Sequence, residues 1–135
     1  MGATRYSVAG VAVENGKVFI ARRVPGGGLG GKWEFPGGKV EAGESDEAAL
    51  IREFQEEFAV TVRPGPFLGS ASFEHRGETR VLRAYRVYLE SRDFILSEHT
   101  AWDWVFPETI AGLDFAGSDM KLLPELAQHL GLFQN

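Results

Sequence analysis

The apolar residues of this chain recur at two different spacings, one typical of strands and one typical of helices. Near the N-terminus, residues 7–13 and 17–21 are apolar and rich in β-branched side chains, and Asn15-Gly16 lies between them. An Asn-Gly pair between two such runs is a characteristic hairpin turn. The chain is therefore predicted to begin with a β-hairpin.

Extended segments are also predicted further along the chain. They are residues 33–35 (ending at Pro36), 60–63, 68–75, 79–89 and 101–106. The two longest of them form a second hairpin, which turns near Arg76-Gly77. Pro107 then opens a short helical turn.

Two helices are predicted among these strands. The first begins after Ser45, a good N-cap, and ends at Phe58. Its apolar positions, Leu50, Ile51, Phe54 and Phe58, are predicted to lie on one buried arc. The second runs from near Ser118 through Leu130, where Pro124 favours either a kink or a later start. Strands combined with two helices predict an α+β sandwich, and residues 1–135 are expected to form one domain.

Composition narrows the classes of function. The net charge is −5, so the chain lacks the basic surface that long nucleic acids require. It contains no cysteine, which excludes disulfides and suits a reducing cytoplasm. No apolar run is long enough to span a membrane. We expect a cytoplasmic protein with a small-molecule partner and leave the choice between monomer and homodimer open. The three histidines, His75, His99 and His129, have no spacing that suggests zinc.

The first predicted helix carries the main candidate chemistry. Glu53, Glu56 and Glu57 stand at i, i+3 and i+4, so they share one face within a single turn. Carboxylates this close repel one another unless cations lie between them. Mg²⁺ binds oxygen ligands and is commonly held by a few carboxylates together with substrate phosphates. The alternative interpretation is a solvated acidic face.

The segment before this helix adds a second signal. Gly37 and Gly38 follow Pro36 and allow the backbone to approach a ligand closely, and their carbonyls can coordinate a metal. Lys39 can reach a phosphate as a point charge. A tight turn between strand and helix is the alternative for these glycines.

Taken together, these residues resemble the Nudix box. Its conserved positions match Gly38, Glu44, Arg52-Glu53 and Glu56-Glu57 with the spacing intact. Residues 19–23 and 33–38 resemble the nucleotide-pool-sanitising branch, which includes 8-oxo-dGTP and (deoxy)CTP diphosphatases. Two positions depart from the family pattern, because Ala59 replaces a glycine and Phe54 replaces an aliphatic residue.

The resemblance implies a fold, a metal site and a reaction. The fold is a mixed β-sheet between helices, with the box as a loop-helix-loop. Mg²⁺, for which Mn²⁺ can substitute, would be bound by Glu53, Glu56, Glu57 and the Gly37 carbonyl, with Glu98 recruited from a later loop. Arg52 would orient a glutamate, and Glu44 would support the loop. Water would attack a phosphorus of the diphosphate bridge, and Glu53, Glu56 or Glu98 would accept its proton.

Substrate selection is assigned to a second group of residues. By resemblance, Arg23 clamps a phosphate, with Gly38 and Lys39 also contacting the substrate. Phe35 either stacks on the base or belongs to the core. Asp119 either reads the base edge or caps the last helix. A carboxylate favours a base edge rich in donors, such as that of cytosine or guanine.

Several substrates therefore stay open. The preferred reaction converts an 8-oxo-dGTP-like or (deoxy)CTP-like triphosphate to a nucleoside monophosphate and pyrophosphate. The alternatives are ADP-ribose, a nucleotide sugar or a dinucleoside polyphosphate as substrate, or a catalytically silent nucleotide-binding module.

Overall fold

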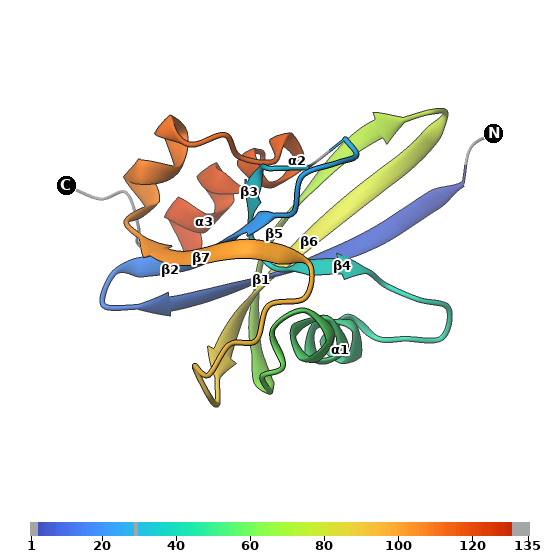
Figure 1. Ribbon diagram of the computed structural model, residues 1–135. Coiled ribbons are helices and arrows are strands. Elements are labelled where there is room, and N and C mark those ends of the chain that lie inside the picture. The colour runs from blue at the N-terminus through green and yellow to red at the C-terminus, as the bar shows by residue number, and fades with distance from the viewer. Residues whose placement is uncertain (1–2, 29, 131–135) are drawn as a thin grey trace.

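Within residues 3–28 and 30–130, which the computed structural model describes, seven strands form a bent, mixed sheet with helices on both faces (Figure 1). In chain order the strands are β1 (Thr4–Glu14), β2 (Lys17–Arg23), β3 (Trp33–Glu34), β4 (Gly37–Lys39), β5 (Val62–His75), β6 (Glu78–Leu89) and β7 (His99–Val105). The helices are α1 (Asp46–Phe58), the 3₁₀ helix η1 (Pro107–Gly112), α2 (Gly117–Met120) and α3 (Leu123–Leu130).

Strand β1 lies at the centre of the sheet and pairs with β2, β4 and β6. Residues 4–12 run parallel to β6, while Ser7 to Ala9 also pair antiparallel with β4. Only Val13 and Glu14 of β1 pair with β2. The predicted hairpin turn is therefore present, but its two strands pair only next to the turn. The apolar run of β1 is buried on both faces of the sheet, which suits a strand flanked on both sides.

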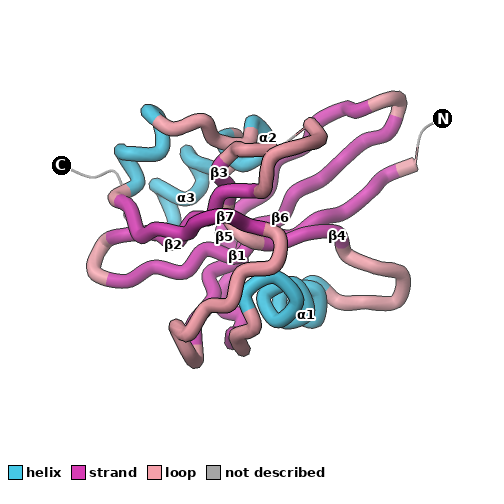
Figure 2. Tube along the Cα trace, in the orientation of Figure 1, coloured by secondary structure: helices cyan, strands magenta, loops and turns pink. Residues whose placement is uncertain are grey.

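Two hydrophobic cores lie on opposite faces of the sheet. Helix α1 packs Leu50, Phe54 and Phe58 against one face. On the other face, η1 contributes Ile110 and α3 contributes Leu126. Figure 2 shows α1 on one side of the strands and the other helices on the opposite side. This arrangement confirms the predicted mixed sheet between helices.

Some boundaries differ from the prediction. Residues 60–63 and 68–75 were expected as separate segments, but β5 runs through both, with irregular pairing between Pro64 and Gly69. The tight turn that was the alternative for Gly37 and Gly38 is not formed, because residues 37–39 are strand β4. The last helix is divided into α2 and α3, and Pro124 lies in the first turn of α3, as the later-start alternative proposed. No helix of the described residues is long and apolar enough to cross a membrane.

Helix α1 is fixed at its N-terminus by two sets of contacts. The Ser45 hydroxyl oxygen accepts a hydrogen bond from the Ala48 N–H at 3.1 Å, as expected of an N-cap. The Asp46 carboxylate accepts hydrogen bonds from the Arg83 guanidinium and the Tyr85 hydroxyl, each at 2.6 Å. These bonds tie the first turn of α1 to β6 and so fix how the acidic residues further along α1 face the sheet.

The predicted buried arc of α1 is wrong at one edge. Ile51 is 41% exposed, whereas Glu57 is 2% exposed. At 3.6 residues per turn, Glu57 follows Leu50 by about two full turns and therefore lies directly above it. Glu57 consequently occupies the centre of the buried face, and Ile51 lies beyond its edge. The acidic and apolar arcs of α1 overlap instead of being separate.

Phe54, which departs from the family pattern, fits a notch in β1. A Cβ built on Gly10 would lie 2.5 Å from the Phe54 ring, so only glycine leaves room for the ring at that position. The large Phe54 side chain of α1 therefore fits because Gly10 of β1 has no side chain.

Ala59 ends α1 in the left-handed conformation, with φ 58° and ψ 33°, and its N–H donates to the Gln55 carbonyl. A Cβ is strained there, so we expect Ala59→Gly to increase the free energy of unfolding by about 1 kcal/mol. Urea denaturation measures this change. The same exchange at Ala48, which is exposed within α1, should instead destabilise the protein. Destabilisation by Ala59→Gly would refute the strain.

Candidate functional site

The loop between β6 and β7 delivers Glu98 to the end of α1. The last carbonyls of a helix lack partners within the helix. Here the Ile95 N–H donates to the Phe58 carbonyl at 3.0 Å, and the Ser97 N–H donates to the Glu57 carbonyl at 3.3 Å. The Ser97 hydroxyl also donates to the Glu56 carbonyl at 2.8 Å. The same bonds that satisfy the helix end therefore hold Glu98 beside the acidic residues.

Three carboxylates meet at this place. Glu53, Glu57 and Glu98 each offer an oxygen, and these oxygens lie within 4.8 Å of one another. Gly38 of β4 lies against the group, because a Cβ added there would come within 2.5 Å of the Glu53 carboxylate. The structure thus brings together three residues that the sequence assigned to metal binding, Glu53 and Glu57 of α1 and Glu98 of the β6–β7 loop, and places Gly38, a predicted substrate contact, beside Glu53.

Glu56 lies outside this cluster. Its side chain is 57% exposed and reaches the Arg52 guanidinium at 3.4 Å. Gly37 lies in β4 opposite Ala9 of β1, and a Cβ on Gly37 would overlap the Val8 carbonyl oxygen. Only glycine therefore allows β4 to run this close to β1.

Arg52 organises the acidic face. Its guanidinium donates two hydrogen bonds to the Glu44 carboxylate, at 2.8 and 2.9 Å, and one to Glu53 at 2.9 Å. It also donates to the Lys39 carbonyl at 2.9 Å, which joins β4 to α1. The bond from Arg52 lowers the pKa of Glu44 to about 2. Arg52 thus contacts both Glu53 and Glu44, and the orienting and supporting roles that the resemblance implied for Arg52 and Glu44 stay predictions.

Glu57 is a buried carboxyl group with an unsatisfied oxygen. Within the described residues, its Oε1 atom is buried and has no hydrogen-bond partner. Burial, together with the nearby carboxylates of Glu53, Glu34 and Glu98, raises the pKa of Glu57 to about 11. A buried polar atom without a partner is costly in any fold. The cost is relieved if a cation binds there.

The donor set fits a hard divalent cation. Glu53, Glu57 and Glu98 offer only oxygen atoms, which Mg²⁺ prefers, and the orphaned Glu57 oxygen supplies a free ligand position. The exposed position of Glu98 leaves the cluster open on one side, where substrate phosphates and water can complete the coordination.

A cavity of about 240 Å³ lies next to the acidic cluster. It extends from Gly38 and Lys39 of β4 to Asp119 of α2, and Arg23 and Phe35 also line it. All five residues predicted to bind substrate therefore border one cavity. Phe35 is mostly buried, and its ring packs edge-on against Phe115 at 5.3 Å. Phe35 thus belongs to the core and forms part of the cavity wall.

Asp119 is a buried residue in the wall of this cavity. It is 6% exposed, and its Oδ2 atom accepts a hydrogen bond from the Phe35 backbone N–H at 2.8 Å. Burial and, to a smaller extent, the negative charge of Glu34 raise the pKa of Asp119 to about 7. Asp119 makes no side-chain capping bond to α2, so the capping alternative is wrong.

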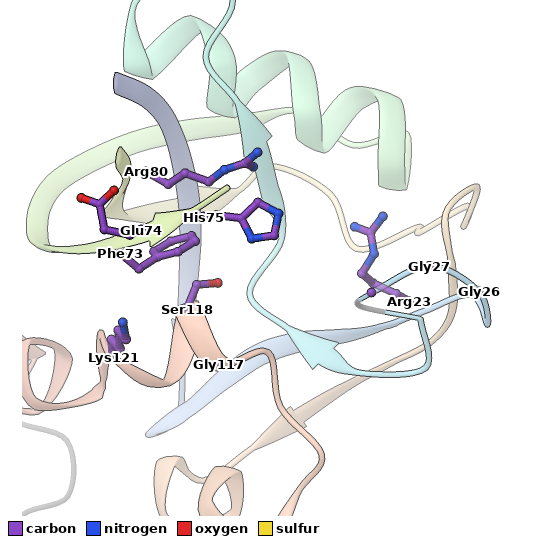
Figure 3. Close-up of a pocket in the computed structure, with 11 residues that line it drawn as sticks. Arg23, Gly26, Gly27, Phe73, Glu74, His75, Arg80, Gly117, Ser118 and Lys121 are labelled. Atoms are coloured by element: carbon purple, nitrogen blue, oxygen red, sulfur yellow. The ribbon is translucent and has the colours of Figure 1, made fainter. Parts of the chain in front are cut away.

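A second cavity of about 790 Å³ adjoins the first, and Arg23 and Ser118 border both. Figure 3 shows Arg23 on one side of it, with Phe73, His75 and Arg80 from the β5–β6 hairpin across from it. Lys121 adds another positive charge to its lining. Arg23 therefore contributes to the walls of both cavities.

Sequence reasoning missed two buried residues, Glu34 and His99. The His99 Nε2 atom lies 2.9 Å from the Glu34 carboxylate, and Glu34 also accepts a hydrogen bond from Arg23 at 3.3 Å. Together with Glu57, they form a second group of potential ligands within 4.8 Å. Glu34 adjoins the quoted box residues, but no local pattern links it to a histidine so far along the chain.

Comparisons with known proteins identify the family of this chain. A model of the NUDIX domain matches residues 3–126. The chain is 38% identical over 126 residues to the putative 8-oxo-dGTP diphosphatase 2 of Mycobacterium tuberculosis, covering 91% of this chain and 88% of that one. It is 34% identical to the CTP pyrophosphohydrolase of Escherichia coli, over 86% of each chain. The solution structure of the E. coli ORF135 protein superposes with a TM-score of 0.85 and 30% identity, over 96% of this chain and 94% of that one.

The buried carboxyl group of Asp119 should make stability depend on pH. Its pKa is about 7 in the folded protein, against an ordinary value of 3.8. The stabilisation from the proton is therefore complete below about pH 4 and is lost as pH rises through about 7. Asp119→Asn removes this dependence but keeps an oxygen for the Phe35 N–H. We expect the variant to gain stability relative to the native protein from pH 4 to pH 8.

Urea unfolding of the metal-free proteins across this range measures the difference. Asp103→Asn removes an exposed carboxylate and serves as the control. A difference between native and Asp119→Asn protein that does not vary with pH would contradict the burial argument.

Proposed function

Because the chain belongs to the NUDIX domain family, we propose that it hydrolyses a nucleoside triphosphate to a nucleoside monophosphate and pyrophosphate, with Mg²⁺ as its cofactor. The observation that carries the proposal is Glu57, a buried carboxyl group that has one oxygen without a hydrogen-bond partner and offers a ligand atom within 4.8 Å of Glu53 and Glu98. A cavity with a buried acceptor, Asp119, lies directly beside it. This combination suits a substrate with a phosphate chain at one end and a hydrogen-bonding base at the other.

The metal end of the site comprises Glu53, Glu57 and Glu98, with Gly37 and Glu56 as further candidate ligands. Arg52 holds Glu53 in place, and the loop bonds at the end of α1 hold Glu98. A divalent cation bound here, Mg²⁺ or Mn²⁺, would polarise the attacking water and stabilise the charge of the phosphate oxygens.

Glu98 is our choice for the group that accepts the proton of the attacking water. Glu53 already accepts a hydrogen bond from Arg52, and Glu56 lies outside the cluster. Glu98 is exposed on the open side of the cluster, and no hydrogen bond to its side chain is present among the described residues. Its carboxylate is therefore free to reach a water molecule beside the substrate.

In this proposal the base lies at Asp119 and the phosphates point towards the carboxylate cluster. Gly38, Lys39 and Arg23 line the same cavity, where the Arg23 guanidinium can bind a phosphate oxygen. Two relatives are named an 8-oxo-dGTP diphosphatase and a CTP pyrophosphohydrolase. These names point to two classes of base, a guanine type and cytosine, and an acidic residue that recognises the base suits both. Both guanine and cytosine offer an amine to a carboxylate acceptor.

The adjoining larger cavity favours a test of longer substrates as well. Its volume of about 790 Å³ gives room for a second group beyond the triphosphate, such as the sugar of ADP-ribose or a second nucleoside. A cytoplasmic location and the choice between monomer and homodimer remain predictions from the sequence.

The proposal is tested by measuring pyrophosphate release from normal and oxidised nucleoside triphosphates, with ADP-ribose and a dinucleoside polyphosphate included. We expect turnover of at least one triphosphate with Mg²⁺ and loss of turnover with chelator. Glu53→Gln and Glu57→Gln should reduce kcat by about 100-fold or more while the chain still folds, because each removes a charged ligand.

Glu47→Gln is the matched control, since Glu47 lies on the same helix but is exposed in its first turn. It should leave turnover unchanged. Failure of the native protein on every substrate with Mg²⁺ would overturn the proposal and favour a silent binding module.

Asp119 should determine which base the protein prefers in its triphosphate substrate. Asp119→Ala removes the buried acceptor, so we expect the ratio of kcat/KM between the best and second-best triphosphate to fall by roughly tenfold or more. The same variant should retain metal-dependent turnover, since Asp119 lies outside the carboxylate cluster. An unchanged ranking would show that another residue reads the base.

A further inference from the structure

We propose that His99 and Glu34 are positioning residues, which together hold the Arg23 guanidinium in place to bind the nucleotide. This inference rests on the proposed function, because Arg23 contacts the substrate only if the cavity binds a nucleotide. Neither His99 nor Glu34 belongs to the carboxylate cluster Glu53–Glu57–Glu98.

The contacts form a chain from strand β7 to strand β2. The His99 imidazole donates from Nε2 to the Glu34 Oε2 atom at 2.9 Å. The same oxygen accepts a hydrogen bond from the Arg23 Nη1 atom at 3.3 Å. Glu34 therefore lies between a completely buried histidine and an arginine that lines both cavities.

His99 is held more firmly than the other two members. Its side chain is completely buried, and its ring stacks on Phe58 at a centroid distance of 4.9 Å and an angle of 19°. Its backbone is in register with Arg23, at a bulge in the β2–β7 pairing. The Val24 N–H, next in the chain, donates to the Glu98 carbonyl at 3.2 Å. The fixed His99 ring can thus hold the Glu34 carboxylate in place and, through it, the Arg23 guanidinium.

The surroundings of Glu34 explain why it needs such a partner. Its side chain is mostly buried, and the acidic groups Glu57 and Asp119 lie near enough for its charge to act on both. A buried carboxylate among like charges turns towards any available donor. His99 supplies a donor that does not move, so the Glu34 carboxylate keeps its orientation and offers its oxygen to Arg23.

Arg23, in contrast, is only partly held. Its side chain is 34% exposed and lines both cavities. Arginine carries several rotatable bonds, and fixing them before the ligand arrives lowers the entropic cost of binding. Without the Glu34 carboxylate oxygen, the Arg23 guanidinium would sample many positions between the two cavities.

The test is a double-mutant cycle on nucleotide affinity. His99→Leu removes the donor, and Arg23→Ala removes the group that we take to contact the nucleotide. Binding of a non-hydrolysable triphosphate analogue is measured with Mg²⁺, alongside KM and kcat of the best substrate. We expect each single variant to weaken analogue binding by about tenfold. The double variant should bind no more weakly than Arg23→Ala alone, because His99 acts only through that side chain.

Further variants separate positioning from general damage. His99→Gln keeps an N–H donor near the Nε2 position and should restore most of the affinity. Glu34→Gln keeps the volume but weakens the bond to Arg23, and should also be non-additive with Arg23→Ala, which provides the same test if His99→Leu fails to fold. His129→Leu, at an exposed histidine in α3, should bind the analogue like the native protein.

The outcomes distinguish this inference from the function on which it rests. Additive losses in the double variants, or an Arg23→Ala variant that binds the analogue normally, would overturn the positioning role. A native protein that binds the analogue, shows non-additivity and hydrolyses nothing would refute the proposed hydrolysis but support the positioning role.

Discussion

Crowding of negative charge around one turn of α1 is the constraint on which the rest of the site depends. Glu53, Glu57 and Glu98 meet within a few ångströms, and Glu34 lies close enough to act on Glu57. The fold opposes this crowding from outside the cluster, with Arg52 bonded to Glu53. No side chain of the described residues bonds the orphaned Glu57 oxygen. The protein thus leaves one carboxyl oxygen without a partner, and a bound cation can supply that partner.

The position of α1 against the sheet creates this arrangement. Because Glu57 shares the helix face of Leu50 and Phe54, packing the core necessarily buries the carboxyl group as well. The free carbonyls at the helix end then capture the loop that precedes β7, and Glu98 arrives with it. Stability and chemistry are linked here, since the bonds that close the helix also complete the cluster.

The sequence predicted the parts of the site that depend on local spacing. The i, i+3, i+4 pattern and the paired glycines identified Glu53, Glu57 and Gly38, and the resemblance pointed to Glu98 and Asp119. Burial of Glu57 was missed because its position on the helix was judged by charge instead of by angle. The contact between Glu34 and His99 depends on the pairing of β2 with β3 and β7, which no local pattern reveals. The parallel pairing of β1 with β6 was missed for the same reason.

The notch at Gly10 has a consequence for how this chain can change over time. The Phe54 ring occupies the space that a Cβ on residue 10 would fill, so the two positions are not independent. Restoring the common aliphatic residue on the helix would leave a void, and adding a methyl group to the strand would displace the ring. Changing residues 10 and 54 one at a time therefore passes through a poorly packed intermediate. Engineering by family consensus at either position should therefore treat them as one unit.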